Sequence, residues 1–163
     1  MILQVHKAVY IGDLEGLVFT NKKDWAIIHA SQKFHYKLFG WDYKNNKPPK
    51  THPCYLKYKE EHEISLNLVD GGPHLYEWFG VEGFKELLDF IDHNINLNRK
   101  IFIHCDKGES RSPSIALLYL AKRVGALNKN SYLEACSEFT KIYPKYNPLG
   151  IAEYLYINWS KIF

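Results

Sequence analysis

The hydrophobic and polar positions along the chain predict alternating strands and helices. Short apolar runs at 8–12, 25–30, 63–70 and 100–105 have the length and residue types of strands. Between 81 and 97, apolar residues recur at three- and four-residue steps, which indicates a helix with one face toward the core. A strand, a helix and a strand in this order are typical of a parallel βαβ unit.

The last third of the chain has a helical pattern. The last strand is followed by a short polar loop and an apolar run that predicts a helix, with Ser112 at its N-cap and Pro113 at its first helical position. Gly125 is a suitable end for this helix. Two further helical stretches, at 131–142 and 149–160, are separated by the breaker segment YPKYNPLG.

These elements indicate a single α/β domain. The chain has 163 residues, of which 46% are hydrophobic and 24% charged, and this balance excludes a disordered tail or a small disulfide scaffold. No repeat or long linker divides the sequence, so we expect one domain over 1–163. Its central sheet should be mixed but largely parallel, with helices on both sides, and 31–63 should be an insertion or a variable loop region.

We expect neither a membrane span nor an export signal in this sequence. No apolar run approaches the roughly 20 residues of a membrane helix, and His6 and Lys7 interrupt the first residues before a signal-peptide core can form. We therefore expect a cytoplasmic protein with no membrane partner. The net charge of +3 does not by itself indicate a nucleic-acid partner, and a monomer is favoured.

The cysteines and histidines do not form a metal site in the sequence. Cys54, Cys105 and Cys136 are far apart and odd in number, so we expect reduced thiols, although a redox role for Cys54 or Cys136 stays open. The eight histidines show no ligand spacing. We expect neither a metal nor a cofactor.

The segment IHCDKGESRSPS, residues 103–114, carries the candidate chemistry. It lies between a buried strand and a helix N-terminus, where backbone N–H groups and the helix dipole form a cradle for an anion such as phosphate. We expect the side chains of its two acids to face solvent or a neighbouring cation, because they would repel a bound phosphate. The residues expected to form the phosphate cradle, together with Arg111, are Asp106, Lys107, Gly108, Glu109 and Ser110.

Cys105 and Arg111 frame this loop. The positive field at the loop lowers the pKa of a thiol there, so Cys105 would be a thiolate at neutral pH, which is the form that attacks phosphorus. The planar guanidinium of Arg111 can hold two phosphate oxygens at once and neutralise charge in the transition state, which a lysine cannot do in the same way.

The loop sequence HCDKGESRS resembles the Cys-x5-Arg loop of the protein tyrosine phosphatase superfamily, and its HC-x-x-G-x-SRS form resembles the dual-specificity branch. VYIGDLEG is similar to an early strand and turn of that family. YNPLGIAEYL is similar to the start of its C-terminal helix, although Tyr146 stands in place of a proline and Tyr154 in place of a glutamine. The segment 31–63 resembles nothing in the family.

This resemblance implies a role for each matching residue. Cys105 would be the nucleophile that forms a cysteinyl-phosphate, and Arg111 would be the phosphate clamp. Ser112 would hydrogen-bond the sulfur and help it leave in the second step. His104 would orient the loop and tune the thiol, and the alternative is a buried histidine with only a structural role.

Hydrolysis also needs a proton donor for the leaving group, and Asp70 is the candidate. It ends a predicted strand, so it should emerge at the same sheet edge as Cys105. It lies 35 residues before Cys105 and is followed by Gly-Gly-Pro, which resembles the acid loop of small family members. The alternative is an Asp-Gly turn without catalytic role. Asp42 and Asp13 are the fallback acids.

The segment from Lys33 to Lys59 holds seven lysines and one acid among many aromatic residues. Such a surface can bind a phosphopeptide, a lipid headgroup or single-stranded nucleic acid. The simpler interpretation, which we favour, is an insertion whose aromatic residues pack while its lysines are solvated.

The favoured function is a metal-independent phosphatase that hydrolyses phosphotyrosine, and also phosphoserine and phosphothreonine, in a phosphorylated protein partner. This assignment rests on the resemblance. One alternative is an RNA 5′-triphosphatase or another non-protein phosphatase, and a second is a non-catalytic phosphoresidue-binding module.

Overall fold

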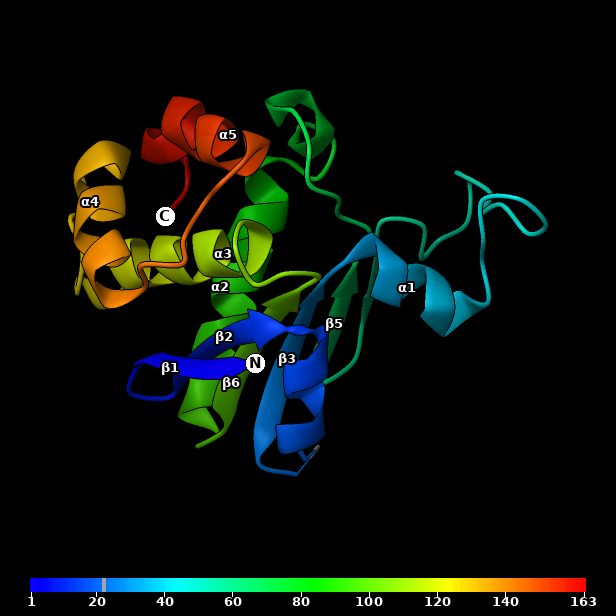
Figure 1. Ribbon diagram of the computed structural model, residues 1–163, viewed down its shortest axis with the longest axis horizontal. Helices are drawn as coiled ribbons and strands as arrows, with labels where there is room; N and C mark the ends of the chain where they lie inside the picture. The colour runs from blue at the N-terminus through cyan, green and yellow to red at the C-terminus, as the bar shows by residue number, and fades with distance from the viewer. Residues whose placement is uncertain (22) are drawn as a thin grey trace.

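The computed structural model describes residues 1–21 and 23–163. Within them the chain forms a six-stranded sheet with the strand order β1-β2-β6-β3-β5-β4 (Figure 1). The strands are β1 (Ile2–His6), β2 (Val9–Asp13), β3 (Trp25–Ala30), β4 (Lys57–Lys59), β5 (Glu63–Leu66) and β6 (Lys100–Cys105).

The four central strands of the sheet, β2, β6, β3 and β5, run parallel, and the two edge strands, β1 and β4, run antiparallel to their neighbours. The mixed, largely parallel sheet predicted from the sequence is therefore confirmed. The two edge strands were not predicted, because β1 alternates only weakly and β4 is three residues long.

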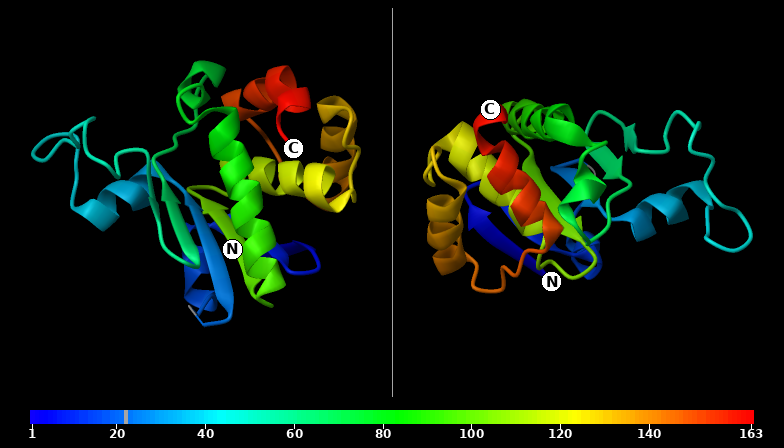
Figure 2. Two further views of the ribbon diagram at one scale, coloured as in Figure 1. Left: turned by 180° about the vertical axis from the view of Figure 1, so that it is seen from behind. Right: turned by 90° about the horizontal axis from the view of Figure 1, so that it is seen from above.

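Helices cover the sheet on both faces, as expected. On one face, α2 and α3 pack against the central strands, and α4 and α5 pack against α3 on the side away from the sheet (Figure 2). On the other face, the 3-10 helix η1 contributes Leu17 to a smaller cluster around Trp25 and Phe102, and α1 follows β3. The helices are η1 (Leu14–Phe19), α1 (Gln32–Phe39), η2 (Pro73–Tyr76), α2 (Gly80–Asn96), α3 (Arg111–Tyr119), the π-helical turn η3 (Leu120–Val124), α4 (Tyr132–Ile142), α5 (Gly150–Asn158) and η4 (Trp159–Lys161).

The predicted core helix at 81–97 corresponds to α2. Its inward face buries Phe84, Leu87, Leu88 and Ile91 completely or nearly so. Each such side chain contributes about 1.5–3 kcal/mol relative to an exposed one, so the periodicity marks the residues that hold α2 on the sheet.

The helix after β6 begins two residues earlier than predicted. The N-cap position is occupied by Ser110 and not by Ser112, since the backbone N–H of Ser114 already donates to the carbonyl of Ser110 at 3.0 Å. The Ser112 hydroxyl is engaged elsewhere, as described below. Gly125 ends the helical segment in the left-handed conformation, as expected.

The predicted strand at 63–70 is shorter in the structure. β5 ends at Leu66, and the following residues turn out of the sheet at its C-terminal edge. There the carbonyl of Leu68 accepts a hydrogen bond from the backbone of Gln32 at 2.8 Å. The segment that carries Asp70 thus leaves the sheet beside the end of β3.

The segment 31–63 projects from the sheet as α1, a loop and β4 (Figure 1). Its aromatic side chains stack on one another, with Phe39 and Trp41 rings 4.6 Å apart and Tyr58 against Phe39. Its lysines lie at the surface. This arrangement agrees with the simpler of the two interpretations, although its origin as an insertion stays a prediction.

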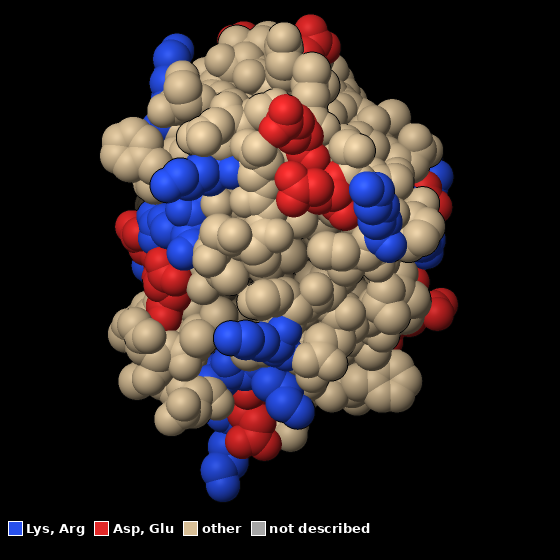
Figure 3. All heavy atoms as spheres, turned by 90° about the vertical axis from the view of Figure 1, so that its left-hand side faces the viewer, with Lys and Arg blue, Asp and Glu red and all other residues tan. Residues whose placement is uncertain are grey.

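Among the described residues, charged side chains do not gather into one large patch on the face shown in Figure 3. On the face that carries α4, basic and acidic side chains form small separate groups among uncharged ones (Figure 3).

Of the described helices, none has the length and apolar character needed to cross a membrane.

Candidate active site

The loop between β6 and α3 takes a conformation that requires glycine. Gly108 has a φ of +71°, and a Cβ there would lie 3.0 Å from the carbonyl carbon of Gly12. Tyr143 donates a hydrogen bond from its hydroxyl to the carbonyl of Gly108 at 2.6 Å. The backbone N–H of Asn147 donates to the carbonyl of Glu109 at 2.8 Å. The segment before α5 therefore holds the loop from its outer side.

Cys105 lies at the base of this loop and is 1% exposed. Its Sγ is 3.2 Å from the Oγ of Ser112, which also donates to the carbonyl of Gly12 at 3.2 Å. A hydroxyl has one proton, so when it donates to Gly12 the Cys105 thiol must donate to Ser112. If Cys105 is a thiolate, the Ser112 hydroxyl can turn and donate to the sulfur instead.

Arg111 is held in place through all three of its nitrogen atoms. Its Nη1 donates to the carbonyls of Ala30 and Leu68 at 3.0 and 2.7 Å. Its Nε and Nη2 donate to the two carboxylate oxygens of Asp70 at 3.0 and 3.2 Å. Burial opposes the charge on Arg111, but the carboxylate of Asp70 outweighs burial and raises the pKa of the guanidinium.

Asp70 therefore occupies the edge of Arg111 that can bind two oxygens of a phosphate. The side chain of Asp70 is 28% exposed and that of Arg111 is 3% exposed, so the pair lies at the bottom of an opening toward solvent. Asp106 lies beside the same guanidinium, with its carboxylate 3.5 Å from Nη2, and accepts a hydrogen bond from the Ser31 hydroxyl. Of the two acids in the loop, Asp106 thus faces a cation.

His104 is fully buried on the opposite face of the sheet from α3. Its Nε2 is 2.6 Å from Nδ1 of His29, whose own Nε2 is 3.2 Å from a carboxylate oxygen of Glu63. Burial, followed by repulsion from His29, lowers the pKa of His104 to about 3, so its ring is neutral at physiological pH.

The fallback acids have other roles in the structure. Asp13 accepts a hydrogen bond from the backbone of Gly16 and caps η1. Asp42 accepts hydrogen bonds from the backbone of Asn45 and Lys44, and these bonds lower the pKa of its carboxyl. A carboxyl that is held ionised in this way is a poor proton donor.

A cavity of about 600 Å³ opens above Arg111, Asp70 and Asp106. Its outer wall comes from α1 and from the residues directly after it. The residues that form this wall are Gln32, Lys33, Tyr36, Lys37, Trp41, Asp42 and Tyr43. Part of the lysine- and aromatic-rich segment thus borders the candidate site.

Part of the chain is similar in sequence to known dual-specificity protein phosphatases. A dual-specificity protein phosphatase of Arabidopsis thaliana, PHS1, is 36% identical over 78 residues, which are 48% of this chain and 8% of that protein. Human dual specificity protein phosphatase 5 is 39% identical over 56 residues, which are 29% of this chain and 15% of that protein. The chain thus matches only a small part of these relatives, and no family model matches it.

Solved structures with the same fold cover nearly the whole chain. The human tyrosine phosphatase-like serine/threonine/tyrosine-interacting protein has a TM-score of 0.67 at 17% identity, over 98% of this chain and 96% of that one. DUSP15 has a TM-score of 0.63 at 17% identity, over 97% and 86% of the two chains. The chain is thus similar in sequence to part of several dual-specificity protein phosphatases and shares the fold of these solved structures. The shared fold agrees with the resemblance of the loop sequence HCDKGESRS to the Cys-x5-Arg loop.

The structure brings together the residues singled out in the sequence. Cys105, Ser112, Arg111 and Asp70 meet at the C-terminal edge of the sheet. Their catalytic roles stay predictions.

Three further residues at the site were not found from the sequence: His29, Glu63 and Tyr143. A polar residue inside the apolar strand WAIIHA was a signal for His29, which lies opposite His104 in the register of β3 and β6. No local pattern marks Glu63 or Tyr143, because their contacts come from distant parts of the chain.

Proposed function

We propose that the chain is a cysteine-dependent phosphatase that hydrolyses phosphotyrosine in proteins without a metal. The main support is the convergence of Cys105, buried beside Ser112, with an arginine that already binds a carboxylate through two nitrogens. A carboxylate and a phosphate present similar pairs of oxygens, so this edge of Arg111 suits a phosphate in size, charge and direction.

In the first step of the proposed reaction, the Cys105 thiolate attacks phosphorus. The S–P bond forms while the bond from phosphorus to the leaving oxygen breaks. The phosphate takes the Nε and Nη2 edge of Arg111, so Asp70 must leave it and then lies next to the leaving oxygen. A protonated Asp70 gives that oxygen its proton, and a phenol is released.

In the second step, water attacks the cysteinyl-phosphate. Asp70, now ionised, takes a proton from the water, the S–P bond breaks, and inorganic phosphate leaves. The Ser112 hydroxyl donates to the departing sulfur and stabilises its negative charge. The thiolate is thereby restored, and Ser112 acts mainly in this second step.

The shape of the site favours phosphotyrosine. Cys105 and Arg111 are 1% and 2% exposed, so a substrate must reach down to them, and a tyrosine side chain reaches further than a serine. Tyr36, Trp41 and Tyr43 border the opening and offer contacts for an aromatic ring. We expect phosphoserine and phosphothreonine to be slower substrates.

The test is release of phosphate from a phosphotyrosine peptide in the presence of EDTA. We expect turnover by the parent protein, and a loss of at least 1000-fold in Cys105→Ser, which removes the sulfur nucleophile. Cys136→Ser is the matched control and should keep parental activity. Turnover that survives Cys105→Ser would contradict the proposal.

Two results would point to the alternative functions. Phosphate release from a triphosphate-ended RNA but not from the peptide would favour an RNA 5′-triphosphatase. Tight binding of the peptide without turnover would favour a phosphoresidue-binding module.

A further inference from the structure

A pair of buried histidines connects the candidate nucleophile to the opposite face of the sheet. His104 directly precedes Cys105 and is 0% exposed, and His29 on β3 is 3% exposed. Their rings meet nearly edge to face, with centroids 4.8 Å apart and an interplanar angle of 77°. The candidate mechanism described above makes no use of His29.

The contact between the two rings needs one proton. Nδ1 of His29 and Nε2 of His104 are 2.6 Å apart, a distance at which one nitrogen must donate and the other accept. Because His104 is neutral, it carries one ring proton, on either Nδ1 or Nε2. The role of His29 in this contact therefore decides which nitrogen of His104 is protonated.

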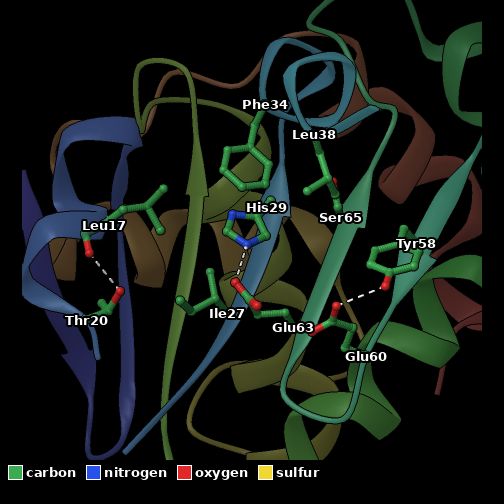
Figure 4. A pocket seen from close by; sticks show the side chains of 10 residues that line it. All are labelled: Leu17, Thr20, Ile27, His29, Phe34, Leu38, Tyr58, Glu60, Glu63 and Ser65. Carbon is green, nitrogen blue, oxygen red and sulfur yellow. Dashed lines mark hydrogen bonds and ion pairs between the residues drawn. The ribbon is translucent and has the colours of Figure 1, made fainter. Parts of the chain in front are cut away.

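His29 is itself held in a fixed orientation. Its ring stacks on Phe34 with centroids 3.8 Å apart, and its Nε2 lies against the carboxylate of Glu63 (Figure 4). A carboxylate only accepts, so Nε2 carries a proton. The charged and titratable groups near His29 include Glu63 on β5, His104 on β6 and His35 on α1, and Glu60 lines the same cavity of about 360 Å³.

The proton position on His104 matters for Cys105. Nδ1 of His104 lies next to Cys105 in the chain, is buried, and has no hydrogen-bond partner among the described residues, so only the contact at Nε2 selects the tautomer. Nδ1 of His104 can act as a donor or as an acceptor toward its surroundings, but not as both. A mixture of the two tautomers would leave the start of the phosphate-binding loop with two electrostatic environments.

We propose that His29 is a positioning residue for Cys105: it holds His104 in one tautomer, and Glu63 holds His29 in turn. His29 and His104 together then fix the backbone conformation of the loop start and the electrostatic field at the Cys105 thiol. The proposal rests on Cys105 being the nucleophile of the proposed function, but it makes a separate statement about the reactivity of the thiol.

The first test is the rate at which iodoacetamide alkylates Cys105 at pH 6.5, followed by mass spectrometry of the Cys105 peptide. His29→Phe keeps an aromatic ring against Phe34 and removes both nitrogens. We expect alkylation to slow about tenfold, which corresponds to the cost of a buried polar group without its partner. In the same variant kcat should fall by a similar factor while KM changes little.

Matched variants separate positioning from loss of packing. His29→Asn keeps a hydrogen-bonding atom near the place of Nδ1 and should restore most of the parental alkylation rate. Glu60→Gln changes the other acid of the cavity, whose carboxylate accepts from Tyr58 and not from His29, and should have no effect. Equal rates in His29→Phe and the parent would overturn the proposal, and so would a loss in His29→Asn as large as in His29→Phe.

A second measurement needs no variant and covers the case in which His29→Phe does not fold. Long-range ¹H–¹⁵N spectra of the parent report which ring nitrogen of each histidine carries a proton. We expect a single, unchanging neutral tautomer of His104 between pH 6 and 8, and a mixture of tautomers would overturn the proposal. The alkylation rate of Cys105 and the tautomer of His104 can both be measured without phosphatase activity. If the proposed function fails, turnover is absent, but these two measurements still decide whether His29 positions Cys105.

Discussion

At the scale of single residues, the ion pair between Asp70 and Arg111 occupies the edge of Arg111 that would bind a phosphate. Arg111 cannot bind a phosphate and the Asp70 carboxylate through the same two nitrogens. In the proposed mechanism, binding of a substrate exchanges one oxygen pair for another, and the displaced carboxylate then lies where a proton donor is needed. The same contact thus keeps the arginine oriented before a substrate arrives.

The proposed proton-donor role of Asp70 predicts that the rate of hydrolysis depends on the leaving group. Asp70→Asn should slow hydrolysis of phosphotyrosine peptides about 100-fold or more, because a tyrosine phenolate leaves poorly without a proton. Loss on p-nitrophenyl phosphate should be at least tenfold smaller, since its leaving group is stable as an anion. The measurement is kcat for both substrates.

The control for this prediction is Asp89→Asn, at an exposed acid that pairs with Arg123 far from the loop. It should leave both rates unchanged. Equal losses on the two substrates in Asp70→Asn would assign the proton donor to another residue.

At the scale of elements, the N-terminus of α5 fixes the segment that follows Asp70. The backbone N–H of Gly150 donates to the carbonyl of Gly71 at 2.8 Å, and a Cβ on Gly150 would lie 1.9 Å from that oxygen. The glycine is required here because two backbones approach closely. The N-terminus of α5 is thus in direct contact with the acid-bearing segment.

Gly150→Ala should displace Gly71 and with it Asp70. We expect kcat for a phosphotyrosine peptide to fall about tenfold or more, since even small misplacement of a catalytic group is costly. Ala152→Ser, on the same helix, serves as the control. Parental kcat in a folded Gly150→Ala protein would show that the acid segment is not held by α5.

The helix α1 supplies a different prediction, because it carries Lys33 and Lys37 beside the cavity that leads to Arg111. Their positive charge should favour phosphopeptides with acidic residues next to the phosphotyrosine. The double change Lys33→Glu and Lys37→Glu should raise KM for such a peptide about tenfold or more at low salt. Hydrolysis of p-nitrophenyl phosphate, which lacks flanking residues, should change little.

A charge-matched control for α1 is the double change Lys47→Glu and Lys50→Glu in the exposed loop that follows. It alters the net charge equally but lies outside the residues that line the cavity. If both double variants raise KM to the same degree, the effect belongs to the net charge and not to α1.

At the scale of the whole molecule, buried histidines link stability to pH. The pKa of His104 is lowered to about 3 in the folded protein, and burial also lowers the pKa of His35. An unfolded chain binds protons at these rings near pH 6.5, so the folded state is favoured fully above that pH and loses stability as the pH falls toward 3.

We therefore expect the free energy of unfolding to decrease by about 2 kcal/mol between pH 7 and pH 5 from His104 alone. Urea denaturation at the two pH values measures it. His104→Asn, which cannot titrate, should show a smaller decrease. An unfolding free energy that stays constant or rises toward pH 5 would contradict the burial of neutral histidines.

The sequence predicted the parts of this molecule that depend on local patterns. The apolar runs located β2, β3 and β6, the periodicity located α2, and the HC-x-x-G-x-SRS segment located Cys105, Arg111 and Ser112. Strand direction placed Asp70 at the correct edge of the sheet, because parallel strands end together.

Other features depend on contacts between distant segments and could not be predicted. The helix start was misplaced at Ser112 because its hydroxyl is used by Cys105 and Gly12 and not by the helix end. The contact of His29 with His104 joins residues 75 positions apart and exists only because β3 and β6 are neighbours. The short edge strand β4 exists through its pairing with β5.

The most direct test of the account is to trap the covalent intermediate on Cys105. Ser112→Ala should slow release of phosphate from sulfur more than its formation, so brief reaction with p-nitrophenyl phosphate and acid quenching should leave a phosphoryl group on the Cys105 peptide, detected by mass spectrometry. We expect this adduct on Cys105 alone, and none in Cys105→Ser. Turnover without any phosphoryl group on Cys105 would contradict the central claim that this cysteine is the nucleophile.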